Sequence, residues 1–122
     1  MAKLTGLDVA ALQASDIERS KGFYTRILGL EVDTQGPPHA IVFETKPIPF
    51  AICEPNVDLS AANRLGWGAA LWFACDDADA LHAKVVEAGV PVIAPPVDGA
   101  FGRFFIISDP DGHALTVHQS SR

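Results

Sequence analysis

One order of predicted elements occurs twice along this chain of 122 residues. Each copy begins with a strand, continues with one short helix and ends with three strands. The first copy spans about residues 4–55 and the second about residues 65–119. This duplication predicts a single α+β domain of two tandem βαβββ modules, with an open cup-shaped sheet and the helices on its convex side. The concave face, which no helix covers, is where a small-molecule site is expected.

Both copies contain residues that typically begin and end a helix. Ser15 and Glu18 have the spacing of a capping box, and Gly29 can take the left-handed conformation that ends the first helix. Asp76 or Asp77 caps the second helix, which Gly89 closes. We expect strands over residues 6–14, 31–35, 39–44 and 49–54, and then over 66–75, 90–93, 102–108 and 114–118, with Pro95 and Pro96 ending the strand that starts at Val90.

Composition excludes several classes of protein. The formal net charge of −6, with scattered basic residues, argues against a nucleic-acid partner. No apolar run approaches the roughly 20 residues that span a membrane, and the N-terminal residues lack the apolar region of a signal peptide, so we expect a cytoplasmic protein. Cys53 and Cys75 do not form a CxxC pair, and we interpret them as reduced core thiols on the helix-facing side of their strands.

Two motifs resemble the vicinal oxygen chelate superfamily, which includes glyoxalase I, extradiol dioxygenases and the fosfomycin- and bleomycin-resistance proteins. The motifs are Asp16-Ile17-Glu18-Arg19-Ser20 with Phe23-Tyr24 and Leu28-Gly29-Leu30, and Asp109-Pro110-Asp111-Gly112-His113. The resemblance covers essentially the whole chain. It implies the paired-module fold, an open cup for the ligand and a homodimer, and it leaves open whether modules swap between chains.

Metal-dependent members of that superfamily hold a divalent ion through His, Glu or Gln at up to four equivalent strand positions. The resemblance places three of these positions at Val9, Ala70 and Thr116, and laying the two modules on each other, with Ile52 on Thr116, places the fourth at Ile52. None of these is a usual ligand for a catalytic ion. By subtraction, we expect no metal site and no cofactor, as in the branch whose best-known members bind an antibiotic without altering it.

Strand alternation puts residues two apart on one face, which gives a candidate lining for the cup. Trp72 is the sharpest candidate, because an indole on an open sheet face can stack on a planar ligand; the alternative is a core tryptophan. Trp67 is a rim or dimer residue, and Arg103 either holds a carboxylate or phosphate or is a solvated surface residue. Parity does not settle whether Phe104 or Phe105 faces the cup. The predicted ligand-binding residues are Val9, Gln13, Phe50, Ile52, Glu54, Trp67, Ala70, Trp72, Arg103, Thr116 and His118.

These features favour a binding protein for an apolar or aromatic small molecule such as an antibiotic. The alternative is a lyase, isomerase or dioxygenase of the same superfamily. Such an enzyme would use a metal held by displaced ligands, or would be metal-free with His118 and Glu54 as an acid–base pair. A third hypothesis is a small dimeric domain that binds some metabolite. The sequence leaves all three open.

Overall fold

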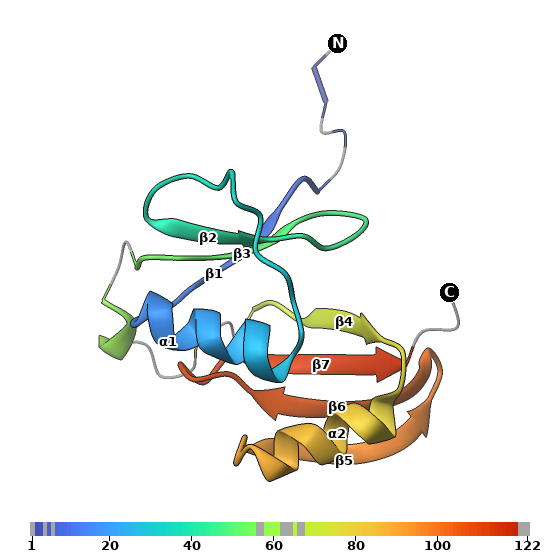
Figure 1. The fold of residues 1–122 in the computed structure, drawn as a ribbon. Coiled ribbons are helices and arrows are strands. Elements are labelled where there is room, and N and C mark those ends of the chain that lie inside the picture. The colour runs from blue at the N-terminus through green and yellow to red at the C-terminus, as the bar shows by residue number, and fades with distance from the viewer. Residues whose placement is uncertain are drawn as a thin grey trace. The chain divides into compact units, whose positions relative to one another are not determined.

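The computed structural model describes residues 2, 3, 5, 7–55, 58–61, 65 and 68–119. The chain divides into two compact units, Met1–Asp58 and Leu59–Arg122, and each unit carries one small sheet and one main helix (Figure 1). Within the described residues, neither helix has the length and apolar character needed to cross a membrane. The mixed α+β class predicted from the duplicated element order is therefore confirmed.

The first unit contains a three-stranded sheet in the order β1-β3-β2. Strand β1 runs parallel to β3, and β2 runs antiparallel to β3. Its elements are β1 (Ala10–Gln13), α1 (Ile17–Gly22), a π-helical segment (Phe23–Ile27), β2 (Ala40–Phe43) and β3 (Phe50–Cys53).

Helix α1 begins one residue later than a capping box at Ser15 predicts. The N-cap is Asp16, whose Oδ1 accepts a hydrogen bond from the backbone N–H of Arg19 at 3.1 Å. Ser15 Oγ instead accepts from the Arg19 guanidinium at 3.0 Å. Both side chains suit a cap, and the carboxylate takes that role here because it also favours the positive end of the helix. Gly29, at φ +80°, occupies the left-handed conformation that was predicted for it.

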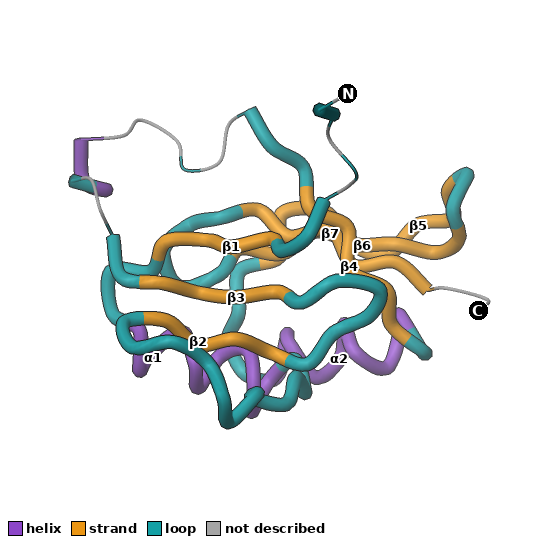
Figure 2. The backbone as a smooth tube through the Cα atoms, turned by 90° about the horizontal axis from the view of Figure 1, so that it is seen from above, coloured by secondary structure: helices purple, strands orange, loops and turns teal. Residues whose placement is uncertain are grey.

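An aromatic core lies between the helix and the sheet of the first unit. Tyr24 is fully buried, and its ring centroid lies 5.6 Å from that of Phe43 and 5.2 Å from that of Phe50. Since β-strand side chains alternate, Ile52 shares the helix-covered face with Phe50. Figure 2 shows the helix of each unit, in purple, against one side of that unit's strands.

The second unit contains a four-stranded sheet in the order β4-β7-β6-β5. Strand β4 runs parallel to β7, and the other neighbours are antiparallel. Its elements are a short 3-10 helix (Leu59–Ala61), β4 (Leu71–Cys75), α2 (Ala78–Glu87), β5 (Val92–Gly99), β6 (Gly102–Ser108) and β7 (Ala114–Gln119).

Strand β5 does not end at the two prolines, so that prediction is wrong. It continues through Pro95 and Pro96 to Gly99, with register shifts against β6 on the way. Proline is tolerated here because β5 is an edge strand and the irregular register spares the missing N–H donors. The strand therefore reaches far enough to form a long hairpin with β6.

Three other strands are shorter than predicted. Of the predicted spans 6–14 and 66–75, the described residues form strands only at Ala10–Gln13 (β1) and Leu71–Cys75 (β4), while residues 6, 66 and 67 lie outside the described residues. Residues 31–35 contribute a single bridge, between Val32 and Phe43. Before β4, Gly68, Ala69 and Ala70 offer little side-chain area to pack, and in residues 31–35 Val32 is the sole apolar residue, so neither segment extends its ladder.

The core of the second unit lies between α2 and one face of its sheet. It is built from alternate residues of β6 and β7, all nearly inaccessible to solvent: Phe105, Ile107, Leu115 and Val117. The turn between these strands has the predicted chemistry. Asp109 Oδ1 accepts from the backbone N–H groups of Asp111 (3.0 Å) and His113 (2.9 Å), and Gly112 has φ +97°.

Candidate functional site

The face of the second sheet that is turned away from α2 carries the main cluster of candidate residues. The register pairs Trp72 with Thr116, Thr116 with Ile106, and Phe104 with His118. Their neighbours along the strands, such as Leu115 and Val117, are the buried core residues. Alternation therefore places Trp72, Phe104, Ile106, Thr116 and His118 on the face opposite to the helix, as the sequence predicts for Trp72, Thr116 and His118.

Four rings gather on this open face, and we call them the aromatic group: Trp72, Phe101, Phe104 and His118. The Trp72 centroid lies 5.9 Å from Phe101, 5.7 Å from Phe104 and 5.7 Å from His118. Trp72 remains 48% exposed and Phe101 71% exposed. Trp72 is therefore not a core tryptophan, and its indole can be reached by a ligand.

The β5–β6 hairpin brings Phe101 and Phe104 to the aromatic group, and two glycines make its shape possible. A Cβ on Gly99 would lie 2.6 Å from Cε1 of Phe104, so glycine leaves room for that ring to cross the hairpin. Gly102 has φ +104°, and a Cβ there would collide with the carbonyl oxygen of Gln119. Any other residue at Gly102 would push the hairpin away from β7.

His118 connects the hairpin to β7. Its Nδ1 lies 3.0 Å from the carbonyl oxygen of Phe101, at the hairpin tip. Its ring also meets Trp72 at an interplanar angle of 69°. His118 therefore holds the tip of the hairpin next to the indole and forms one edge of the aromatic group.

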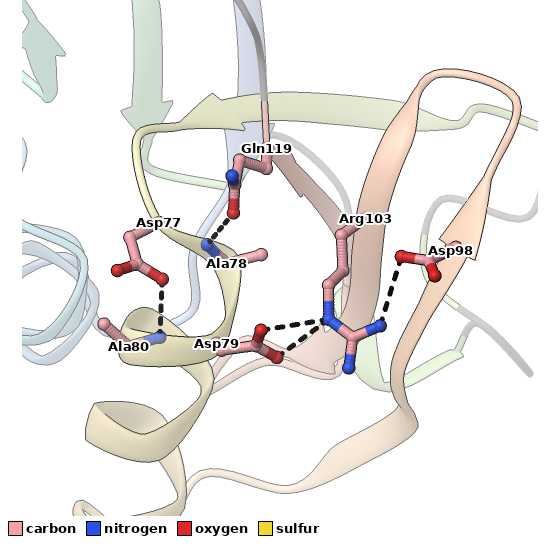
Figure 3. Close-up of polar contacts among 7 residues, drawn as sticks. All are labelled: Asp77, Ala78, Asp79, Ala80, Asp98, Arg103 and Gln119. Carbon is pink, nitrogen blue, oxygen red and sulfur yellow. Dashed lines mark hydrogen bonds and ion pairs between the residues drawn. The ribbon is translucent and has the colours of Figure 1, made fainter.

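Arg103 lies on the helix side of the same hairpin and is already engaged (Figure 3). Its Nε donates to the Asp79 carboxylate at 2.9 and 3.0 Å, and its Nη1 donates to Asp98 at 3.2 Å. These hydrogen bonds, with Asp79 first, raise the pKa of Arg103. The side chain ties α2 to the hairpin on the side away from the aromatic group, and the carboxylates that it holds belong to Asp79 and Asp98 of this chain; a role in ligand binding stays a prediction.

Phe50 and Ile52 are likewise not on the face that the sequence analysis expected. They are 3% and 1% exposed and lie beneath α1 and the π-helical segment. The error comes from the alignment of the two modules, which placed Ile52 on Thr116 without a gap. The strand register gives a different equivalence. Gln13 in the first unit corresponds to Ala74 in the second, and their strand partners are Cys53 and His118, so Cys53 is the counterpart of His118.

The gapless alignment of the two modules fails because the β6–β7 connection is one residue longer than the β2–β3 connection. Pairs Phe43–Phe50 and Ile107–Leu115 correspond, and they enclose residues 44–49 and 108–114. A one-residue slip exchanges the two faces of a strand. Ala51, and not Ile52, is thus the counterpart of Thr116.

The same slip explains two further placements in the first unit. Cys53 lies opposite to the helix, contrary to expectation, and its Sγ contacts the carbonyl oxygen of Leu12 at 3.7 Å. Glu54 is not the counterpart of His118. Its carboxylate lies 3.1 Å from Nδ1 of His39 at the start of β2, and both side chains are exposed. The contacts of the described residues thus give Glu54 and His118 different partners.

The remaining candidates have simple positions. Val9 is 48% exposed just before β1, and Ala70 is exposed just before β4. Gln13 is half-buried at the end of β1. Trp67 lies outside the described residues. Among the described residues, no three His, Cys, Asp or Glu side chains form a group that could hold a metal ion.

Cys75 lies on the helix-facing side of β4, as predicted. Burial raises the pKa of its thiol, and the negative charge of Asp76 raises it further. A raised pKa leaves less thiolate at neutral pH, which is the opposite of what a nucleophilic cysteine needs. Cys75 is therefore a half-buried thiol on the helix side of β4 that is not activated as a nucleophile.

Phe101 and Phe104 are the residues that the sequence analysis did not assign. A signal was available, since Asp109 to His113 form the β6–β7 turn. Counting outward from the pair Ser108–Ala114 puts Phe104 opposite His118 and leaves Phe105 on the buried side. Phe105 indeed packs edge-on against His82 of α2, with ring centroids 5.5 Å apart.

A family model described as the Glyoxalase/Bleomycin resistance protein/Dioxygenase superfamily matches residues 6–117. The chain is also 32% identical, over 120 residues, to the anthracycline biosynthesis protein DnrV of Streptomyces peucetius. That match covers 87% of this chain and 44% of DnrV. The chain spans less than half the length of the curated relatives that it matches.

Two solved structures of similar size share the fold and a quarter of the sequence. TnmS3, an antibiotic-binding protein from Streptomyces sp. CB03234, superposes with a TM-score of 0.72 at 25% identity, covering 99% of this chain and 100% of TnmS3. The bleomycin-binding protein of Streptomyces verticillus, complexed with copper(II)-bleomycin, gives a TM-score of 0.67 at 25% identity with the same coverage.

Proposed function

The chain belongs to the glyoxalase/bleomycin resistance protein/dioxygenase superfamily, and from that premise we propose that it binds a flat, largely apolar small molecule on the aromatic group of its second unit. The observation that carries the proposal is the exposed indole of Trp72 among Phe101, Phe104 and His118. Exposed apolar clusters of this kind commonly mark binding sites.

The aromatic group suits stacking. A planar ring placed against an indole gains about 0.5–1.5 kcal/mol beyond the burial of its area. Phe101 adds a second exposed ring at an angle of 82° to Trp72, so a ligand can contact the face of one ring and the edge of the other. The net charge of −6 adds long-range attraction for a cationic ligand.

The similar proteins support a small-molecule ligand. Two structural neighbours are described as binding antibiotics, and DnrV is described as an anthracycline biosynthesis protein. We infer that the ligand of this chain is also a natural product with fused or linked aromatic rings. We propose in addition that the chain is one cytoplasmic domain of two modules and that it works as a homodimer.

We propose that this binding needs no metal ion. At the positions where metal-dependent members carry ligands, this chain has Val9, Ala51, Ala70 and Thr116 once the register is corrected. Only Thr116 has a polar side chain, and a neutral hydroxyl is a poor ligand for a catalytic ion. The donor set therefore does not fit the ion, and binding by stacking is favoured over metal-assisted chemistry.

The test is a fluorescence titration with bleomycin and with an anthracycline. Trp67→Phe leaves Trp72 as the sole tryptophan of the chain, so quenching then reports on Trp72. We expect saturable quenching in Trp67→Phe and at least tenfold weaker binding, measured by calorimetry, in Trp72→Ala. Val86→Ala, which removes exposed apolar area from α2, is the control and leaves binding unchanged. Binding that survives Trp72→Ala with the fold intact by circular dichroism overturns the proposal.

A further inference from the structure

We propose that His118 selects the ligand: its Nε2 accepts one hydrogen bond from a hydroxyl or N–H group at the edge of a planar aromatic molecule. The inference rests on the proposed function, because it needs a ring stacked on Trp72. It adds the chemical class, a hydroxylated or amino-substituted aromatic in place of any flat apolar compound.

The first step is the position of the proton on His118. A carbonyl oxygen carries no hydrogen, so the 3.0 Å contact with Phe101 is a hydrogen bond only if Nδ1 is the donor. In a neutral imidazole with a proton on Nδ1, Nε2 is unprotonated and can only accept. The hairpin tip thereby fixes the tautomer of His118, as a second partner commonly does for histidine.

The second step is the accessibility of Nε2. No hydrogen bond of this nitrogen is found among the described residues, and Nε2 is not among their buried, unsatisfied side-chain atoms. It is therefore open to solvent. The ring lies 5.7 Å, centroid to centroid, from Trp72, so the same ligand can cover the indole and reach Nε2.

The third step is that few other polar side chains lie near this nitrogen. The side chains next to the His118 ring are Trp72, 5.7 Å away between centroids, and Phe104, its cross-strand partner on β6, and neither offers an acceptor. Thr116, two residues along β7, has a hydroxyl that can donate or accept and so does not discriminate. Arg103, the charged residue of the adjacent strand, is engaged on the helix side. Among the described side chains of this face, Nε2 of His118 is therefore the group that can only accept, and selection falls on it.

The cost of a wrong ligand follows from this arrangement. A ligand without a donor covers Nε2 and leaves it without the water that it had before. Sites built to hydrogen-bond a substrate group discriminate against analogues that lack it. For one neutral hydrogen bond at a partly open surface we expect about threefold to tenfold weaker binding of the analogue.

The test compares 2-naphthol with 2-methoxynaphthalene, which differ by the methyl group that removes the donor. Binding is followed by the ¹H–¹⁵N shifts of the backbone amides of β7, which wild-type protein and every variant retain. We expect wild-type protein to bind 2-naphthol about threefold to tenfold more tightly. His118→Asn can keep a donor to the Phe101 carbonyl but has no acceptor at the place of Nε2, so the preference falls to about one. His118→Gln reaches that place with an amide oxygen and restores part of the preference.

The outcomes separate the two proposals. Equal binding of both compounds by wild-type protein, lost in Trp72→Ala, overturns the selection by His118 and leaves the proposed function standing. Binding unchanged in Trp72→Ala, or no binding of either compound together with no binding of bleomycin or an anthracycline, overturns the proposed function. A preference for 2-naphthol that persists in His118→Asn also overturns the selection by His118.

Discussion

The two units share one order of elements but carry opposite kinds of side chain on the sheet face away from the helix. The register makes Ala11 the counterpart of Trp72, and Ala51 that of Thr116. Three further positions show the same reduction in size from the second unit to the first: Phe104 to Ala40, Ile106 to Val42 and His118 to Cys53. The helix-covered faces, by contrast, are equally aromatic or branched in both units.

The duplicated fold therefore constrains the size of the core side chains in both units, but it does not constrain the side chains on the open faces. A core position must fill volume at native packing density, so both copies keep large side chains there. The open face carries no such demand. One copy holds rings that can stack on a ligand, and the other holds smaller residues, among them the buried Ala51.

We expect the largest loss of stability from Phe50→Ala, which tests whether Phe50 belongs to the core or to the binding face. Phe50 is 3% exposed and packs on Tyr24 and Phe43, so its removal leaves a cavity that costs about 3–5 kcal/mol in the free energy of unfolding. Trp72→Ala, which opens no cavity in a core, costs much less. Urea unfolding of both variants measures the difference. A stable Phe50→Ala protein that has lost ligand binding would return Phe50 to the binding face.

A smaller effect is expected at the hairpin of the second unit. Gly102→Ala places a Cβ at positive φ against the Gln119 carbonyl, which costs about 1–3 kcal/mol and moves Phe101 away from Trp72. Thermal unfolding and the bleomycin titration should both respond. Gly22→Ala is the matched control, since its Cβ meets nothing within 4 Å at the end of α1, and it leaves stability equal or raised. Equal behaviour of the two variants would contradict the hairpin's role.

The two units are alike at the N-terminal caps of their helices. Asp16 and Asp77 each accept from the backbone N–H three residues on, at 3.1 and 3.0 Å. We expect Asp16→Ala and Asp77→Ala each to lower the free energy of unfolding by about 1 kcal/mol. Ser15→Ala and Asp76→Ala test the neighbours and should change it less. A larger loss from Ser15→Ala than from Asp16→Ala would reinstate the capping box.

The features that the sequence predicts correctly are those that depend on local interactions. The duplicated element order, both helix ends at glycine and the Asp109–His113 turn follow from side chains within a few residues of one another. The open-face position of Trp72 and His118 followed from simple alternation. What failed depended on register across a connection, because one extra residue after Ile107 exchanged the faces assigned to Ile52 and Cys53.

The contribution of Phe101 to the candidate site was out of reach for a different reason. Its place next to Trp72 depends on a long-range contact with His118 and on an edge strand that continues through two prolines. No pattern along the hairpin itself announces either feature. The rings of a binding face are thus set by pairing between distant strands, whereas caps and turns are set by neighbours.

The smallest expected effect concerns the two thiols, which lie on opposite sides of their sheets. In Cys53→Ser, Cys75 is the sole cysteine, and burial followed by the charge of Asp76 raises its pKa. We expect iodoacetamide at pH 8 to alkylate it several-fold more slowly in the folded protein than in urea, because less thiolate is present. The alkylation rate of the folded protein should keep rising at pH values where the unfolded chain has levelled off. Cys53→Ser/Asp76→Asn removes the second cause and should react faster than Cys53→Ser alone. Equal rates for folded and unfolded Cys53→Ser would contradict the raised pKa and show that the partial burial of Cys75 does not protect its thiol.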